Sequence, residues 1–223
     1  MARNSSNKEA MLTKIRQALL SSVKQPFPQT EATGPVYQTD DEPLDIQFAT
    51  EFTHVNGHFV FCENEKECVE NLKELIGHNQ YTRITCYEPE LHAMFDRQAF
   101  INYDTDAAVQ DTQVGITMCE ALVARTGSIL LSSRQPNGRT MPIYPEVHLV
   151  IASTEQIVAD IQDGFALVRK KYNGNFPSML NLNTGPSRTA DIEKTLVLGA
   201  HGPRAVYVFL IDQFPLKWMH AEG

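Results

Sequence analysis

The sequence lacks the cysteine spacing, the long apolar run and the positive charge on which several classes of protein depend. Its four cysteines include no pair with Cys-x-x-Cys spacing, so neither a zinc ribbon nor an iron–sulfur site is predicted. No apolar run approaches the roughly 20 residues that span a bilayer, and the first residues lack the apolar centre of a signal peptide. The formal net charge of -8 argues against general nucleic-acid binding, because neutralising phosphates requires clustered lysine and arginine. These absences favour a cytoplasmic protein with no metal cluster of its own, no membrane span and no nucleic-acid partner.

Several catalytic and binding motifs are also missing. The sequence has no G-x-x-x-x-G-K-[ST] phosphate loop, no G-x-G-x-x-G dinucleotide loop and no G-x-S-x-G nucleophile turn. His54 and His58 are four residues apart, but Asn56 and Gly57 between them predict a turn, not a helix that presents both rings to one metal. No metal site is therefore predicted.

The chain changes character near residue 50. Residues 7–23 have helical apolar spacing, whereas residues 24–50 hold four prolines and an acidic cluster, which is typical of a linker or a surface arm. We therefore expect an N-terminal helix with a proline-rich arm over residues 1–50 and an α/β domain over residues 51–223. The helix is expected to pack on the surface of its own domain or on a neighbour, and a homo-oligomer stays open.

Strand and helix patterns alternate from residue 57 onward. They predict strands over 58–62, 81–87, 99–102, 128–132, 147–152, 179–183 and 205–211, and helices over 64–77, 88–96, 117–127, 153–172 and 189–199. Alternation of this kind predicts an α/β fold with a mostly parallel sheet flanked by helices. The fully apolar run over 205–211 suits a central strand that is covered on both faces.

One turn in the C-terminal third has the composition of an anion site. If the strand over 179–183 is parallel, the turn after it lies at the carboxyl edge of the sheet, where ligands bind in such folds. Gly185 allows a tight turn, Ser187 and Thr189 can donate hydrogen bonds, and Arg188 adds a positive charge. Ordinary helix capping explains the same hydroxyl residues, so both interpretations stay open.

His201 lies in a second candidate loop, between two glycines. It can act as an acid–base group or ligand, or it can simply hydrogen-bond the loop. A helix over 189–199 would run from the carboxyl edge to the opposite edge, which places His201 roughly 15 Å from Ser187 at 1.5 Å per residue. The two loops can lie side by side at one edge of the sheet, as we first expect, only if this helix is shorter and the chain doubles back. With the full helix, which we favour, His201 has a separate structural or interface role, and Gly185, Ser187, Arg188 and Thr189 are the better ligand-binding candidates.

Four stretches together resemble the LUD-domain family, which includes lactate utilization proteins. Residues 184–193 and 198–203 are similar to its closing signature, and residues 124–131 and 145–150 match two further pieces. The resemblance extends over roughly residues 55–212. It implies a fold like that of ribose-5-phosphate isomerases and CoA transferases.

The resemblance also implies a function. It points to a non-redox or accessory subunit in the bacterial oxidation of L-lactate to pyruvate, beside partner proteins that carry iron–sulfur clusters. No cofactor is then expected in this chain, which agrees with its cysteine spacing. The ligand would be a small carboxylate or a phosphorylated compound. The alternative is a stand-alone enzyme on the same architecture that acts on a phosphosugar or a CoA ester.

The remaining site candidates come from the middle of the chain. Thr126 and Gly127 lie in a piece that carries the resemblance, and Arg125 stands where the family usually has an acidic residue. Arg125 is expected to face the same cleft as Arg188. For the alternative enzyme, Glu120 is the carboxylate nominated for acid–base or nucleophilic chemistry, against a plainer role as a solvated helix residue.

Overall fold

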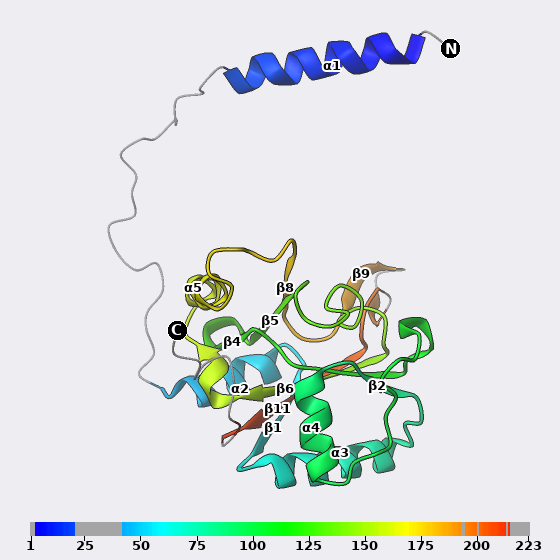
Figure 1. Cartoon of the computed structure of the whole chain (residues 1–223), viewed down its shortest axis with the longest axis vertical. Coiled ribbons are helices and arrows are strands. Elements are labelled where there is room, and N and C mark those ends of the chain that lie inside the picture. The colour runs from blue at the N-terminus through cyan, green and yellow to red at the C-terminus, as the bar shows by residue number, and fades with distance from the viewer. Residues whose placement is uncertain (1–2, 21–41, 193–194, 200, 213, 215–223) are drawn as a thin grey trace. The chain divides into compact units, whose positions relative to one another are not determined.

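The structure, a computed structural model, describes residues 3–20, 42–192, 195–199, 201–212 and 214 (Figure 1). The chain divides into two compact units, Met1–Asp41 and Glu42–Gly223. The first contains α1 (Arg3–Leu20), which confirms most of the predicted helix over 7–23; residues 21–23 lie outside the described part. None of the described helices has the length and apolar character that crossing a bilayer requires.

The second unit begins with a helix that the sequence prediction assigned to the arm. Helix α2 (Leu44–His54) carries Phe48 and Phe52 into the core, where both are fully buried and their rings stack 5.3 Å apart. The expectation that residues 24–50 form no core element is therefore wrong for residues 44–50. The prolines end at Pro43, where a missing N–H costs no helical hydrogen bond, and the two phenylalanines are four residues apart on one face.

A five-stranded parallel sheet forms the centre of this unit. Its order is β1 (His58–Cys62), β11 (Ala205–Ile211), β6 (Val147–Ser153), β3 (Val114–Thr117) and β2 (Ile84–Cys86), and every neighbouring pair is parallel. The apolar run at 205–211 is an inner strand, as expected. The predicted strand at 99–102 is absent, and Asp104 forms an isolated bridge to β2 instead.

Two helices cover one face of this sheet, α3 (Glu65–Asn79) and α4 (Pro89–Arg97) (Figure 1). Asn64 caps α3 by accepting from the Glu67 N–H at 3.1 Å, while the Glu67 carboxylate accepts from the Glu63 N–H at 2.7 Å, one residue before the cap, so the reciprocal bond of a capping box is not made. The predicted apolar face of α3 is buried. The helix continues past Gly77 and ends at Gln80, which adopts φ 56°.

A second, four-stranded sheet packs on the other face, between the parallel sheet and α5 (Ile161–Lys171) (Figure 1). Its order is β7 (Ile157–Val158), β4 (Ala121–Val123), β5 (Ser128–Ser132) and β8 (Leu180–Asn183). The β4–β5 and β5–β8 pairs are antiparallel. Short 3-10 helices lie at Val109–Asp111, Ala124–Thr126 and Thr154–Gln156.

Three helix predictions need correction. The one over 117–127 is wrong because this stretch is the end of β3, then β4 and a 3-10 turn; it is almost wholly buried, and a short buried apolar run has no period that separates strand from helix. The one over 153–172 begins only at Ile161, with Asp160 as its cap, because β7 occupies residues 157–158.

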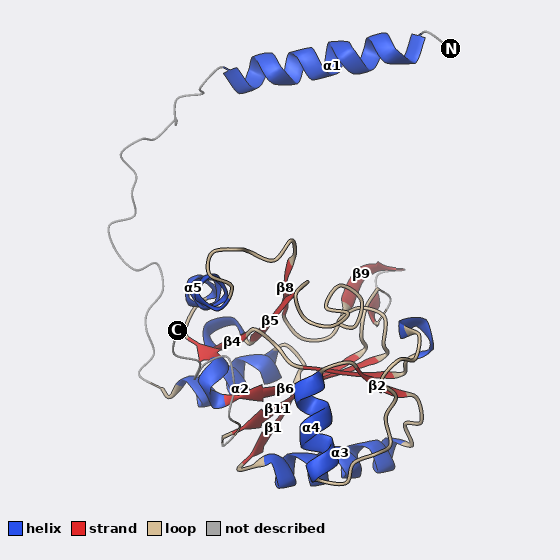
Figure 2. Cartoon of the chain, viewed as in Figure 1, coloured by secondary structure: helices blue, strands red, loops and turns tan. Residues whose placement is uncertain are grey.

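The helix predicted over 189–199 is also wrong. Residues here form two antiparallel strands, β9 (Arg188–Ile192) and β10 (Thr195–Leu198), as Figure 2 shows for the first of them. β-branched residues such as Ile192, Thr195 and Val197 favour strands, and this preference outweighs the capping pattern of Ser187 and Thr189. The fold class stands: a mostly parallel sheet flanked by helices.

Candidate functional site

A buried ionic cluster lies where the chain passes from the parallel sheet to the second sheet. β3 ends at Thr117 and β4 begins at Ala121, so Glu120 lies just past the carboxyl edge of the parallel sheet. Its side chain is fully buried. The plainer role considered for Glu120, a solvated helix residue, is therefore wrong.

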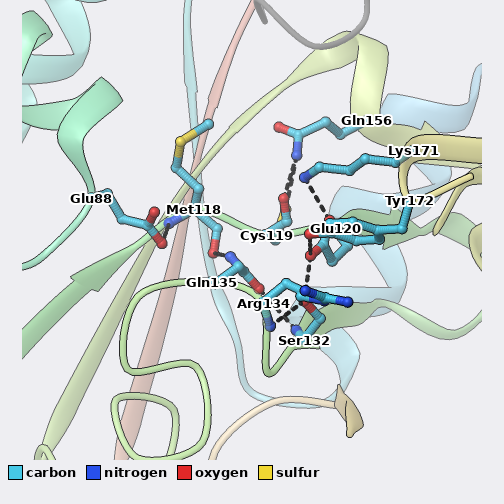
Figure 3. Close-up of polar contacts among 10 residues, drawn as sticks. All are labelled: Glu88, Met118, Cys119, Glu120, Ser132, Arg134, Gln135, Gln156, Lys171 and Tyr172. Atoms are coloured by element: carbon cyan, nitrogen blue, oxygen red, sulfur yellow. Dashed lines mark hydrogen bonds and ion pairs between the residues drawn. The ribbon is translucent and has the colours of Figure 1, made fainter. Parts of the chain in front are cut away.

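Three donors converge on the Glu120 carboxylate (Figure 3). The Lys171 ammonium donates to Oε2 at 2.7 Å, the Tyr172 hydroxyl donates to Oε1 at 2.7 Å, and the Ser132 hydroxyl also donates to Oε1. We call these four residues the Glu120 cluster. A buried carboxylate with a cation and two hydroxyl donors has the pairing that low-dielectric surroundings demand.

Three separate elements bring the Glu120 cluster together. β5 runs antiparallel to β4 and ends at Ser132, beside the start of β4. α5 packs on the outside of the second sheet and ends at Lys171, with Tyr172 as its C-cap. The last turn of α5 is thus directed at Glu120, 51 residues earlier in the chain.

Tyr172 and Arg134 form the solvent side of the cluster. Burial, and then the hydrogen bond to Glu120, raise the pKa of the Tyr172 phenol, so this hydroxyl remains a proton donor. The exposed Arg134 guanidinium lies 5.8 Å from the centroid of the Tyr172 ring. Lys171 keeps 17% of its side chain exposed. Cations therefore stand between the buried carboxylate and water.

A second carboxyl group lies nearby, at the carboxyl end of β2. Glu88 is 4% exposed and accepts one hydrogen bond, from the Met118 N–H at 3.3 Å (Figure 3). Burial raises the pKa of Glu88 to about 7, against the opposing effect of that hydrogen bond. Lys171 and Glu120 also act electrostatically on Glu88. Glu88 therefore exchanges its proton near neutral pH beside the Glu120 cluster.

Two glutamines hold the backbone of the two residues that precede Glu120. Gln135 donates to the Met118 carbonyl at 2.7 Å and accepts from the Ser132 N–H at 2.9 Å. Gln156, fully buried, donates to the Cys119 carbonyl. These side-chain hydrogen bonds hold the chain in place next to Glu120, which is the support that an acid–base or ligand-binding carboxylate needs. Within the described residues, no group of three or more His, Cys, Asp or Glu could hold a metal ion.

The residues predicted from the resemblance lie elsewhere. Thr126 and Thr184 are linked through the Ser128 hydroxyl, at 2.7 and 2.8 Å. A Cβ on Gly127 would lie 2.4 Å from the Phe52 nitrogen, and one on Gly185 would lie 2.3 Å from the Val55 carbonyl oxygen. Both glycines, each with positive φ, therefore let α2 pack against these turns. Their role in ligand binding stays a prediction.

The two candidate loops lie side by side. The Ser187 N–H donates to the Pro203 carbonyl at 2.9 Å, and the Gly199 N–H donates to the Ser187 carbonyl at 2.9 Å. The separation of roughly 15 Å that a helix would impose is therefore wrong, and the alternative in which the chain doubles back is confirmed, because two paired strands fold the chain back. We call residues 185–189, 199 and 201–203 the amino-edge loops.

The position of these loops on the sheet also differs from the expectation. The Arg204 N–H donates to the Glu146 carbonyl at 2.8 Å, where β11 and β6 begin. The amino-edge loops therefore lie at the amino edge of the parallel sheet, not at the carboxyl edge. The strand that precedes them, β8, is antiparallel to β5 in the second sheet, which invalidates the parallel-strand argument.

One of the two loops borders an open hollow of about 490 Å³. His201 lines it together with Tyr144, Glu146 and Arg204, and the last two form an ion pair at 3.6 Å. Arg188 is exposed and Thr189 half-buried. Acid–base and ligand-binding roles for these residues stay predictions.

Arg125 has a carboxylate partner. Its guanidinium donates to both oxygens of Asp160, at 2.7 and 3.1 Å, and this pairing lowers the pKa of the Asp160 carboxyl. Asp160 also caps α5. Arg125 therefore ties the turn after β4 to the start of α5, and whether it also contributes to a ligand site stays a prediction.

Comparison with known proteins places the chain in a family. The LUD domain matches residues 46–211. "Lactate utilization protein C" of Anoxybacillus flavithermus is 27% identical over 224 residues, which cover 92% of this chain and all of that protein. The protein of the same name from Bacillus subtilis is 36% identical over 107 residues, which cover 47% of this chain and 45% of that protein.

A solved structure supports the fold. The crystal structure of a DUF162 family protein from Deinococcus radiodurans aligns with a TM-score of 0.55 and 18% sequence identity, over 75% of this chain and 96% of that one. The family match extends over most of the second unit and includes both the Glu120 cluster and the amino-edge loops. The chain therefore belongs to the LUD domain family.

Proposed function

We propose that this chain is a component of a cytoplasmic system that oxidises L-lactate to pyruvate. The observation that carries the proposal is the alignment with the whole length of a relative named for lactate utilization. Because the sequence has no Cys-x-x-Cys spacing, we assign electron transfer to partner proteins with iron–sulfur clusters. The chain then has an accessory, non-redox role.

We further propose that the Glu120 cluster is the working centre of the chain. It lies at the carboxyl edge of a parallel sheet, the edge where α/β proteins bind ligands. Lys171 and Arg134 are cations on its solvent side, which suits a small carboxylate such as lactate or pyruvate. Glu88 supplies a second carboxyl group that titrates near neutral pH.

Gene deletion in the native host tests the role in lactate utilization. Growth on L-lactate as sole carbon source should stop, growth on pyruvate should continue, and a plasmid copy of the gene should restore growth on lactate. Unchanged growth of the deletion strain on L-lactate would exclude the proposal. Purification of the tagged chain from lactate-grown cells should recover partner proteins with visible iron–sulfur absorbance, and recovery of the chain alone would remove the accessory role.

One observation favours a second candidate, a stand-alone enzyme. Glu120 is fully buried, and hydrogen bonds from Gln135 and Gln156 hold the two residues before it, which suits acid–base or nucleophilic chemistry. Such an enzyme would act on a phosphosugar or a CoA ester. Turnover of one of these compounds by the purified chain alone, lost in Glu120→Gln with Lys171→Met, would establish this candidate in place of the accessory role.

A further inference from the structure

The two outer strands of the parallel sheet, β2 and β1, differ in whether another segment pairs with their outer side. At the β2 edge, the chain covers its own strand: the Cys86 N–H donates to the Asp104 carbonyl at 2.9 Å, and the Asp104 N–H donates to the Ile84 carbonyl at 2.8 Å. At the other edge, no strand among the described residues pairs with the outer side of β1. An open edge of this kind is a template for another strand.

The outward backbone groups of β1 follow from its register. The Cys62 carbonyl accepts from the Asp212 N–H at 3.0 Å, so the backbone of Cys62 faces β11. Because backbone polar groups alternate sides along a strand, Phe59 and Phe61 direct their N–H and C=O groups away from the sheet. Four strong hydrogen-bonding groups therefore lie on the open edge.

β1 has none of the features that protect an edge strand. Its sequence, HFVFC, contains no lysine, no acidic residue and no proline, and the strand has no bulge. Phe61 exposes 45% of its surface. Beside Val60, a cavity of about 440 Å³ opens between β1, β11 and α3, with Leu75, Tyr207 and Phe209 in its lining. The lining also includes Asn71, Glu74 and His78, so edge and cavity together form a partly apolar surface with polar groups on the α3 side.

We propose that a second copy of this chain occupies this surface, with the two β1 strands paired antiparallel about a two-fold axis at Val60. In that register Phe59 of each copy lies opposite Phe61 of the other. These are the residues whose backbone groups point outward, so four hydrogen bonds close across the axis. The register also pairs the aromatic rings across the strands on one face, and two sheets of five strands become one sheet of ten.

Self-complementarity and charge favour a second copy. A two-fold interface uses the same patch on both chains, and β1 meets this condition because its outward residues are symmetric about Val60. Each chain carries a formal charge of -8, yet the strand that would meet its own copy contains no lysine, arginine, aspartate or glutamate. Association should therefore tighten as salt screens the net charge.

Sedimentation equilibrium on the full chain tests the proposal. Wild type should reach twice the 25.1 kDa chain mass as concentration rises. Phe61→Pro removes one outward N–H that the sheet itself does not use, so it should weaken the dimer by at least about tenfold while the monomer stays folded. Phe61→Val keeps the N–H and the preference for a strand, so it is the matched control and should weaken the dimer much less.

Amide hydrogen exchange locates the contact. The Phe59 and Phe61 N–H groups should become more protected as protein concentration rises, and Phe61→Pro should abolish that rise at Phe59. A chain that stays monomeric would overturn the proposal, as would a dimer that Phe61→Pro leaves intact. Protection at these amides that does not depend on concentration would mean that another part of the same chain covers β1, and would overturn it equally.

Discussion

The two edges of the parallel sheet present opposite kinds of chemistry. At the carboxyl edge, the Glu120 cluster buries a carboxylate beside a lysine, a tyrosine and a serine. At the amino edge, the amino-edge loops are held by backbone hydrogen bonds, and charged side chains such as Arg188 are exposed. The buried ionic centre therefore lies at the carboxyl edge, and the amino edge combines backbone packing with exposed charges.

The largest expected effect is a difference in stability loss between a substitution at the carboxyl edge and one at the amino edge. Lys171→Met leaves the Glu120 carboxylate buried without its cation, which should lower the free energy of unfolding by about 3–5 kcal/mol. Glu120→Gln in the same chain should restore most of that loss, because the pair is then neutral. Urea unfolding measures both variants, with exposed Arg188→Gln as the amino-edge control at less than about 0.5 kcal/mol. A loss below about 1 kcal/mol for Lys171→Met would mean that the Glu120 cluster is not a buried ion pair.

Acid should lower the stability of the fold through a buried histidine near the amino edge of the sheet. His148, the second residue of β6, is fully buried, and burial lowers its pKa to about 4. The unfolded chain takes up this proton first, so stability is present above about pH 6.5 and falls by about 3 kcal/mol as pH drops towards 4. His148→Gln should remove that part of the slope. The free energy of unfolding should be measured between pH 7 and 4.5 for wild type and variant. If it changes with pH equally in both proteins, the histidine is not buried in its neutral form.

Packing at the first residue of the amino-edge loops can be isolated by comparing two glycines. Gly185→Ala should lower the free energy of unfolding by about 2–3 kcal/mol, since the residue has φ +76° and the new methyl group would meet the Val55 carbonyl. Gly174 has a similar φ of +78° but no neighbour within 4 Å, so Gly174→Ala should cost only about 1–2 kcal/mol. Equal losses in thermal and urea unfolding would show that α2 does not press on Gly185.

An effect with the opposite pH direction belongs to the carboxyl edge. Glu88 has its folded pKa raised to about 7, so its contribution to stability is present below about pH 4.5 and is lost as pH rises to 7. Glu88→Gln removes this loss and should raise stability at pH 8 by about 3 kcal/mol, with no gain near pH 4.5. The neighbouring Glu90→Gln, on an exposed residue, is the control. A variant less stable than wild type at pH 8 would mean that Glu88 is ionised and well paired.

Local signals in the sequence predicted the parts of the fold that local chemistry decides. The apolar run over 205–211 was interpreted correctly because a strand that is buried on both faces leaves a continuous apolar run in the sequence. The strands β9 and β10 were missed because capping residues and β-branched residues compete there, and only pairing decides between them.

The Glu120 cluster could be foreseen only in part. The sequence identified Glu120 as a carboxylate of interest, but its partners Ser132 and Lys171 lie 12 and 51 residues away in the chain. Their meeting depends on the antiparallel register of β4 with β5 and on where α5 ends. Tertiary geometry of that kind leaves no spacing pattern in a single sequence. For this reason Glu120, which the sequence placed in a helix, could not be predicted to be buried between the two sheets' strands.

Complementation with paired variants tests the central claim, that the Glu120 cluster is the working centre, most directly. Growth on L-lactate should be measured in the deletion strain carrying either Glu120→Gln with Lys171→Met or Ser187→Ala with Arg188→Gln, after thermal unfolding has shown both proteins to be folded. We predict that the first pair abolishes growth on L-lactate and that the second retains most of it. Wild-type growth with the first pair, and none with the second, would contradict the claim and move the working centre to the amino-edge loops.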